Sequence, residues 1–424
     1  MVSYKKVLLI SSWAPPAVGG PQNLYNVLKD FKGRYFILTS FKNLKNASPQ
    51  ASRWLSGEYV FFDNPSAKKE DVLESAKQIY HKRSFVRATL KKVGVIRSVG
   101  NYLIRVITLI WQINGFIKSG LKTVRSGEVD VLLAISDNGP ALISAYIIHK
   151  ITKKPLYIYL FDLYRGNIFP TPLVEKLLAR IFEPMIFRSA EKIILTNEGT
   201  REFYVKRYGE YVRPKVEIVH NSIFPESYLN QGPRATKEGS FKIVFTGRIY
   251  WAQLQSLQNL VKAVEEIDDV DIKLVLYCPN KREYLDKIGI RESSKIKIDF
   301  APVEKMAEIQ SSADILFLPL SWNTKSPEII NTATPGKLSD YLIAGRPILV
   351  HAPRETFLVQ YTQKNNCAMV VDENNVDLLK KSIKELVLNI NLRDNLVKNA
   401  KDVFFRNHDA NKNAEVFESI FRNK

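Results

Sequence analysis

The sequence predicts an α/β protein with two doubly wound parallel-sheet domains that face each other across a cleft. Short apolar strands alternate with amphipathic helical segments through most of the 424 residues. This alternation is typical of parallel sheets that are covered by helices on both faces. It stops once, at a polar stretch rich in proline and glycine, and then starts again. The length also exceeds that of one typical core, so we expect two or three domains.

The first half carries the alternation from residue 7 to residue 219. Its expected strands are 7–11, 35–39, 129–135, 156–161, 191–196 and 215–219, and its expected helices are 22–30, 140–151 and 199–208. In the first of these helices, Leu24, Val27 and Leu28 recur at helical spacing. We therefore assign residues 1–224 to an N-terminal Rossmann-like domain.

Residues 225–240 break the pattern, because they are polar and include Pro225, Gly232, Pro233 and Gly239. We interpret them as a linker. The second domain then spans 241–409, with strands at 241–245, 272–277, 295–300, 315–318 and 348–351 and helices at 256–266, 303–311, 338–344, 376–388 and 392–404. Residues 410–424 form a last helix that we expect to pack toward the N-terminal domain. Ligands of open α/β sheets bind outside the carboxyl ends of the strands.

Composition excludes several classes of protein. A hydrophobic fraction of 45% and a charged fraction of 25% are ordinary for a soluble globular chain. The two cysteines, Cys278 and Cys367, cannot build a disulfide framework and have no metal-ligand spacing, which favours a reducing compartment. The first apolar run is too short for a signal peptide, and no run is long enough to span a membrane. We expect a cytoplasmic protein that is soluble or peripheral.

The positive charge is concentrated in the first half. Residues 1–220 hold 34 Lys and Arg against 17 Asp and Glu, a net +17, whereas the remainder holds 28 against 26, a net +2. Residues 75–127, which we call the basic segment, contain no acidic residue, and their cations alternate with apolar side chains. The candidate membrane contacts in this segment are Lys82, Arg83, Arg87, Lys91, Lys92, Arg97, Arg105 and Trp111.

Two interpretations of the basic segment stay open. Cations beside apolar and aromatic residues are typical of an interfacial helix on anionic lipid, which we favour. Alternatively, residues 103–111 are a core helix and the cations are its solvated face. Nucleic acid is not expected as a partner, because the sequence has no zinc-finger spacing, ribonucleoprotein-type aromatic motif or basic tail.

Three motifs carry candidate chemistry. Gly19 and Gly20 follow the first strand, where adjacent glycines let a backbone approach a phosphate closely, although a tight loop without ligand explains them equally well. Thr246, Gly247 and Arg248 end the first strand of the second domain, and an arginine there can hold a diphosphate bidentately. The segment 335–349 joins a Pro335-Gly336 turn to a short helix with Lys337, Leu338 and Asp340, which together could hold a diphosphate and a ribose.

Together these motifs resemble the retaining family 4 glycosyltransferases of the GT-B fold, in the version found in bacterial surface-polysaccharide enzymes. The resemblance covers nearly the whole chain and also includes segments 190–196, 219–222 and 313–319. It implies that Arg248 grips the donor diphosphate and that Asp340 replaces the second Glu of the Glu-x7-Glu pair, on the ribose. It further implies a donor-binding set of Gly19, Gly20, Thr246, Gly247, Val303, Glu328, Pro335, Gly336, Leu338 and Asp340.

The chain departs from this family at three places. The first Glu of the pair falls on Thr332, with Glu328 nearby but out of register. The phosphate-binding lysine after the Gly-Arg pair is absent, and our hypothesis is that Lys337, or less readily Lys325, compensates. The His-Asp pair of many members is reduced to Asp162, which we expect to orient the acceptor.

The resemblance implies a metal-independent retaining transfer with Arg248, Lys337 and Asp162 as the catalytic groups. No metal site or cofactor is expected beyond the nucleotide-diphosphate sugar, which is a co-substrate. The expected acceptor is lipid-linked or a saccharide, in cell-surface polysaccharide synthesis on the inner face of the cell membrane. A catalytically inactive GT-B nucleotide-binding homologue and a sugar-nucleotide epimerase remain as alternatives.

Overall fold

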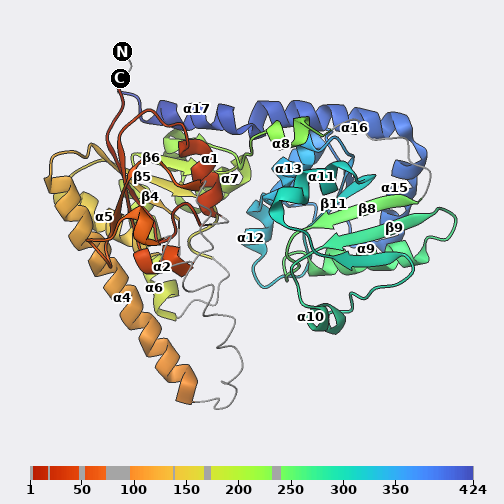
Figure 1. The fold of residues 1–424 in the computed structure, drawn as a ribbon, viewed down its shortest axis with the longest axis horizontal. Coiled ribbons are helices and arrows are strands. Elements are labelled where there is room, and N and C mark those ends of the chain that lie inside the picture. Colours follow the sequence, from red (N-terminus) through yellow and green to blue (C-terminus); the bar gives the residue numbers. More distant parts are fainter. Residues whose placement is uncertain are drawn as a thin grey trace. The chain divides into compact units, whose positions relative to one another are not determined.

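The chain forms two compact units, each built around its own sheet (Figure 1). The computed structural model describes residues 3–17, 20–46, 53–72, 96–136, 139–166, 173–231 and 240–423. Unit 1 comprises Met1–His220 and Asn413–Lys424, and unit 2 comprises Asn221–Lys412. Both sheets are entirely parallel within the described residues, so the predicted fold class of two doubly wound α/β domains is confirmed.

Unit 1 holds a seven-stranded sheet in the order β3-β2-β1-β4-β5-β6-β7. Its strands are β1 (Val7–Ile10), β2 (Tyr35–Thr39), β3 (Glu58–Phe61), β4 (Val131–Ile135), β5 (Leu156–Leu160), β6 (Lys192–Leu195) and β7 (Val216–Ile218). Its helices are α1 (Gly20–Leu28), α2 (Phe41–Asn46), α4 (Ile96–Arg125), α5 (Pro140–Thr152), α6 (Leu173–Ser189), α7 (Glu198–Tyr208) and the short 3₁₀ helix η2 (Glu210–Lys215). The central strands β1, β4 and β5 are buried at every position, as expected for apolar runs covered on both faces.

The end of the chain belongs to the core of unit 1. Helix α17 (Ala410–Ile420) buries Phe417, and the following Phe421 is buried as well. The backbone N–H of Lys5 donates to the Phe421 carbonyl oxygen at 2.8 Å, and the Tyr4 hydroxyl donates to the Glu418 carboxylate. The last residues therefore help to hold the first strand region of this unit.

Unit 2 holds a six-stranded sheet in the order β10-β9-β8-β11-β12-β13. Its strands are β8 (Phe241–Thr246), β9 (Ile272–Tyr277), β10 (Ile296–Asp299), β11 (Ile315–Pro319), β12 (Ile348–His351) and β13 (Met369–Val371). Its helical elements are α8 (Glu226–Leu229), α9 (Leu254–Glu266), α10 (Arg282–Lys287), η3 (Val303–Lys305), α11 (Met306–Ser311), α12 (Pro327–Thr332), α13 (Lys337–Ile343), α14 (Phe357–Lys364), α15 (Val376–Leu388), α16 (Ile390–Val403) and the π turn η4 (Phe404–His408).

Several elements were not expected from the sequence. Helix α6 contains Pro184 and is apolar on most sides, so no 3.6-residue period identifies it. The short helix α8 lies inside the segment 225–240 that we interpreted as a linker, and its Tyr228 is buried in a core cluster of unit 2. Residues 232–239 of that segment lie outside the described residues.

Candidate active site

The strand order of unit 2 locates its ligand crevice. Strands β8 and β11 are neighbours, and from them the chain continues to opposite sides of the sheet. Such a topological switch point opens a crevice at the carboxyl ends of the two strands. Strand β8 ends at Thr246, so Gly247 and Arg248 lie at this point.

Lys337, the first residue of α13, reaches the same point. A Cβ atom placed on Gly247 would lie 3.3 Å from the Lys337 Nζ atom, so the ammonium group lies directly against the Gly247 backbone. Gly247 has φ of +108°, a conformation that other residues adopt only with strain. The Thr-Gly-Arg motif and the Pro-Gly-Lys turn, which are about 90 residues apart in the sequence, therefore meet within unit 2.

The surroundings of Lys337 change its acidity. Its Nζ lies 4.1 Å from the centroid of the Phe245 ring, a cation–π contact. Burial lowers the pKa of Lys337 to about 7, while the Asp340 carboxylate acts in the opposite direction. The site therefore holds a partly desolvated cation that loses its charge near neutral pH.

Asp340 is part of a buried polar network. The Tyr228 hydroxyl lies 2.8 Å from Asp340 Oδ1 and 2.6 Å from Gln310 Oε1, and it donates to one of them at a time. Gln310 Nε2 donates to Thr246 Oγ1 at 3.1 Å, and the Tyr341 hydroxyl accepts the Thr246 backbone N–H at 3.1 Å. Burial raises the pKa of Asp340 to about 6, while the hydrogen bond from Tyr228 and the charge of Lys337 act to lower it. The network joins α13 and α8 to the end of β8.

Two residues of this site are open to an incoming ligand. Arg248 is exposed, and in the described parts of the chain no hydrogen bond or ion pair engages its guanidinium. Gly336 has an ordinary helical φ of −54°, and a Cβ atom there would meet nothing within 4 Å. The fold does not require a glycine at 336, so the absent side chain leaves room beside Lys337.

The remaining donor-side candidates are less tightly placed. Val303 is 57% exposed at the start of η3, and Glu328 is exposed in the first turn of α12. Thr332, which stands at the family's first Glu position, is buried, and its hydroxyl donates to the Glu328 carbonyl oxygen at 2.8 Å. Pro335 accepts the Leu338 backbone N–H at 2.8 Å, which closes the turn before α13.

In unit 1, the glycine loop and the loop after β5 are in contact. A Cβ atom on Gly20 would lie 2.9 Å from the Phe161 ring, so the start of α1 needs a glycine to approach that ring. Asp162, the next residue along the chain, is exposed. Gly19 lies outside the described residues.

The loop after β5 is held by side chains of α6 and α7 that no sequence motif predicts. Glu183 Oε1 accepts the Arg165 backbone N–H at 3.5 Å, and Arg207 Nη1 donates to the Arg165 carbonyl oxygen at 3.3 Å. The Tyr204 hydroxyl accepts the Tyr164 backbone N–H at 3.3 Å. We call Glu183, Arg207 and Tyr204 the loop clamp. It holds the backbone two and three residues beyond Asp162, at Tyr164 and Arg165.

Glu183 is the buried charge of the clamp. Its side chain has no exposed surface, and its Oε2 atom lies 3.7 Å from Arg207 Nη1. Burial raises the pKa of Glu183, and Arg207 offsets part of this effect. Only the spatial meeting of α6 and α7 identifies this pair, because 24 residues of sequence separate its members.

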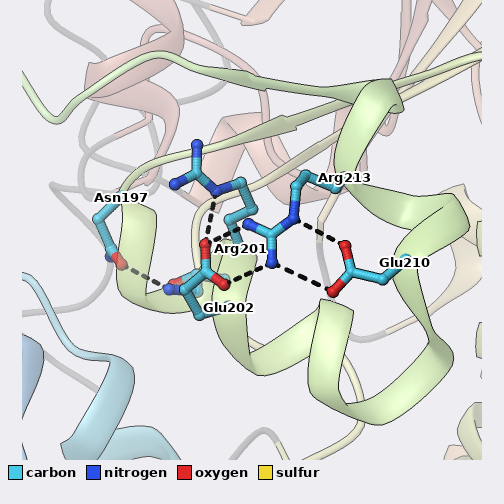
Figure 2. Close-up of polar contacts among 6 residues, drawn as sticks. Asn197, Arg201, Glu202, Glu210 and Arg213 are labelled. Carbon is cyan, nitrogen blue, oxygen red and sulfur yellow. Dashed lines mark hydrogen bonds and ion pairs between the residues drawn. The ribbon is translucent and has the colours of Figure 1, made fainter.

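A second set of ions, on α7 and η2, is exposed and differs from the clamp. Asn197 caps the helix by accepting the Thr200 backbone N–H at 2.7 Å (Figure 2). Arg213 donates to both oxygens of Glu202, at 2.7 and 2.9 Å, and also to Glu210 at 2.8 Å. Hydrogen bonds from Arg213 lower the pKa of both glutamates. Exposed pairs of this kind contribute little to stability.

The predicted membrane contacts fall mostly outside the described residues, which is the case for Lys82, Arg83, Arg87, Lys91 and Lys92. Arg97 lies in the first turn of α4. Arg105 and Trp111 are both exposed on this helix, and the Trp111 ring lies 5.2 Å from the Phe62 ring. No helix within the described ranges is long and apolar enough to cross a membrane. Those ranges also hold no group of three or more His, Cys, Asp and Glu side chains suited to a metal ion.

Comparison with known proteins adds a family match and a set of structural matches. Residues 240–389 match the family model described as "Glycosyl transferases group 1". No curated protein matches the sequence. A glycosyltransferase from Rickettsia africae is similar in structure, with a TM-score of 0.62 at 11% identity over 99% of this chain and 97% of that one.

Two further solved structures are similar. HepE from Anabaena, in complex with UDP-glucose, has a TM-score of 0.62 at 12% identity over 98% of this chain and 99% of that one. WaaG, a glycosyltransferase involved in lipopolysaccharide biosynthesis, has a TM-score of 0.58 at 13% identity over 98% of this chain and 99% of that one. The structural matches establish the GT-B fold. Together with the family match in unit 2, they support a GT-B glycosyltransferase.

Proposed function

We propose that this chain transfers a glycosyl group from a nucleotide-diphosphate sugar to a lipid-linked or saccharide acceptor, with retention of configuration and without a metal ion. The observation that carries the proposal is the meeting of Lys337 with Gly247, beside Arg248, at the switch point of the unit 2 sheet. Two cationic side chains and an open glycine turn provide what a diphosphate requires.

The chemistry follows from charge. When the bond between the sugar and the diphosphate breaks, negative charge grows on the leaving diphosphate. Arg248 and Lys337 would stabilise that charge, the task that a divalent cation performs in other phosphate sites. The acceptor hydroxyl then attacks the anomeric carbon from the same face, and its proton passes to the departing phosphate oxygen. In this scheme Asp162 orients the acceptor.

Asp340 would hold the ribose. Its Oδ1 atom is engaged by Tyr228, which fixes the orientation of the carboxylate before any ligand arrives. A carboxylate that is already held in place accepts hydrogen bonds from the ribose hydroxyl groups without a further loss of side-chain conformational entropy. Tyr228 is therefore a positioning residue for the donor site.

The donor and acceptor classes are proposed from the relatives. HepE was solved with UDP-glucose, and WaaG acts in lipopolysaccharide biosynthesis. We propose a nucleotide sugar of that type as the donor and a cell-surface glycan precursor as the acceptor. The protein would then work as a peripheral protein on the inner face of the cell membrane.

The test begins with nucleotide binding and ends with the product. Thermal stabilisation by UDP, GDP and ADP, and by their sugars, identifies the donor. Transfer to a lipid-linked acceptor is then measured with and without EDTA, and NMR gives the anomeric configuration of the product. An α-linked donor should yield an α-linked product at the same rate in EDTA. Inversion, or loss of activity in EDTA, would overturn those parts of the proposal.

Gly336 offers a matched variant, because its side-chain space is empty. Gly336→Val should leave the urea unfolding midpoint unchanged but weaken donor binding by about tenfold or more, since its methyl groups occupy the ligand side of the turn. Saturable nucleotide binding without turnover of any donor would instead favour the inactive homologue. Conversion of a nucleotide sugar without acceptor would favour the epimerase.

A further inference from the structure

Helix α6 exposes an apolar stripe that is not part of the proposed donor or acceptor site. Leu173, Leu177, Ile181 and Met185 follow one another at four-residue spacing and are 76, 58, 48 and 40% exposed. This spacing keeps all four on one side of the helix. Contiguous exposed apolar side chains mark an interaction surface more often than scattered ones do.

The charges beside this stripe all have one sign. The other exposed residues of α6 are Lys176, Arg180 and Arg188, which lie on the same half of the helix. Glu183 is buried, and Glu175 lies on the opposite half. The surface therefore combines four apolar side chains with three cations and no exposed anion.

Helix α4 presents a second apolar stripe in the same helical layer. Ile104, Ile107 and Trp111 are 62, 65 and 46% exposed at helical spacing, and α4 contains no acidic residue. Helix α5 packs against both α4 and α6. Helices α5 and α6 follow strands β4 and β5, whereas α4 ends just before β4 begins. The N-terminal ends of all three therefore point to the carboxyl edge of the sheet.

The N-terminal end of α4 projects beyond its neighbour. The Ser144 hydroxyl, in the second turn of α5, donates to the Ile113 carbonyl oxygen at 3.3 Å. Helix α4 begins 17 residues before Ile113, whereas α5 begins four residues before Ser144. At 1.5 Å per residue, α4 overhangs the start of α5 by about 20 Å. Figure 1 shows this helix, in orange, extending past the sheet of unit 1.

We propose that the apolar stripes of α4 and α6 form a docking surface of unit 1 for an anionic lipid bilayer. Apolar side chains enter the interface between headgroups and acyl chains, and the cations beside them pair with lipid phosphates. The net charge of +17 on residues 1–220 attracts an anionic bilayer over a longer range. A second copy of this chain fits less well, because a two-fold contact would oppose like charges.

This inference deepens the proposed function and rests on it in one respect, which is that a lipid-linked acceptor gives the enzyme a reason to dock. The docking itself is testable without donor or acceptor. The probe is a set of vesicles of phosphatidylcholine, either pure or with roughly 30% phosphatidylglycerol, in a sedimentation assay with the full chain.

The decisive variant is Leu177→Asp with Ile181→Asp. It should lower partition onto the anionic vesicles by about tenfold or more, because two negative charges replace exposed apolar side chains that would enter the bilayer. The matched control is Leu388→Asp with Ile390→Asp, an apolar pair in unit 2 that is 78 and 59% exposed. The control should partition like the unmodified chain. Lys176→Gln with Arg180→Gln should reduce the preference for anionic over neutral vesicles.

Three outcomes would overturn the inference. They are unchanged partition of the Leu177→Asp, Ile181→Asp variant, an equal loss in the control, and a change of oligomeric mass by light scattering without any change in partition. An unchanged circular dichroism spectrum and urea unfolding midpoint confirm that unit 1 of the variants is folded, and thermal stabilisation by the nucleotide confirms the same for unit 2. A chain that binds vesicles but turns over no donor would refute the proposed function and leave the docking surface standing.

Discussion

Lys337 supplies a positive charge next to Gly247 from a different helix. The loop after Arg248 has no lysine, although the glycosyltransferase family that the sequence resembles carries a phosphate-binding lysine there. Lys337 comes from another helix, yet its ammonium lies against Gly247, one residue from that arginine. A charge can be delivered to the same point from a different element, because a diphosphate responds to the position of the cation and not to its place in the sequence.

The pKa of Lys337 predicts how nucleotide affinity depends on pH. Because burial lowers that pKa to about 7, the ammonium is charged below this pH and neutral above it. Asp340, with a pKa of about 6, is half ionised at pH 6 and almost fully ionised above pH 7, so only Lys337 changes its charge over the upper part of the range. Affinity for a nucleoside diphosphate should fall by about tenfold as the pH rises from 6 to 9, the effect of losing one charged hydrogen bond. Isothermal titration calorimetry measures this change.

The control for this prediction is Lys337→Arg. A guanidinium stays protonated throughout that pH range, so the variant should lose the decline above pH 7. If the arginine variant showed the same decline as the unmodified chain, another group would be responsible.

Substitution of Arg248 should reduce turnover. Arg248 is exposed and directly follows Gly247, where the leaving diphosphate is proposed to lie. Arg248→Ala should lower kcat by roughly a hundredfold, the effect of removing one charge-stabilising donor from a transition state. Arg291→Ala removes another exposed arginine of unit 2 and should leave kcat unchanged. A near-normal rate for Arg248→Ala in a vesicle assay would contradict its assigned role.

At the scale of elements, the loop clamp connects three parts of unit 1. It ties the loop after β5 to α6 through Glu183 and to α7 through Arg207 and Tyr204. Loops that bind substrates work best on a rigid support, because ordering them at the moment of binding costs affinity. The clamp gives the loop that carries Asp162 such a support.

Glu183→Gln tests this arrangement. The substitution keeps the shape of the side chain but leaves Arg207 without its counter-ion, so the free energy of unfolding should fall by about 3 kcal/mol. Urea denaturation measures the change. Glu210→Gln removes an exposed glutamate that pairs with Arg213, and its urea midpoint should not move measurably (Figure 2). Equal effects of the two substitutions would contradict the clamp.

The two units of the molecule differ in net charge and in the motifs that they carry. The excess positive charge lies in residues 1–220, whereas the proposed donor residues Arg248, Lys337 and Asp340 all lie in unit 2. If both proposals hold, donor binding and membrane docking depend on different residues, and a substitution should be able to remove one without the other.

This division predicts the pattern of hydrogen exchange. Without acceptor, a saturating nucleoside diphosphate should slow amide exchange most at residues 247–253 and 334–340, because the ligand stabilises the structure that binds it. At a hundred times the dissociation constant, the expected stabilisation is about 2.7 kcal/mol. Mass spectrometry of the exchanged peptides locates the effect. Protection confined to unit 1 would show that the donor site is assigned to the wrong unit.

Much of the fold was predictable, because a buried parallel strand must be a nearly continuous apolar run. Strands β2, β9 and β12 begin and end where the sequence predicts. Helix α6 was missed, because residues 173–189 are apolar on the buried side and also along the exposed stripe. Position in the sequence does not reveal which apolar face a neighbouring element will cover.

The two parallel sheets, the uneven charge and the motifs at the strand ends could all be inferred from the amino-acid sequence, since each of these depends on residues close together in the chain. The contacts between distant side chains, in contrast, are known only from the folded chain. Tyr228 contacts Gln310 and Asp340, which are 82 and 112 residues away in the sequence, and no local sequence pattern predicts such a contact. The burial that lowers the pKa of Lys337 arises in the same way, because it depends on every element packed around the residue.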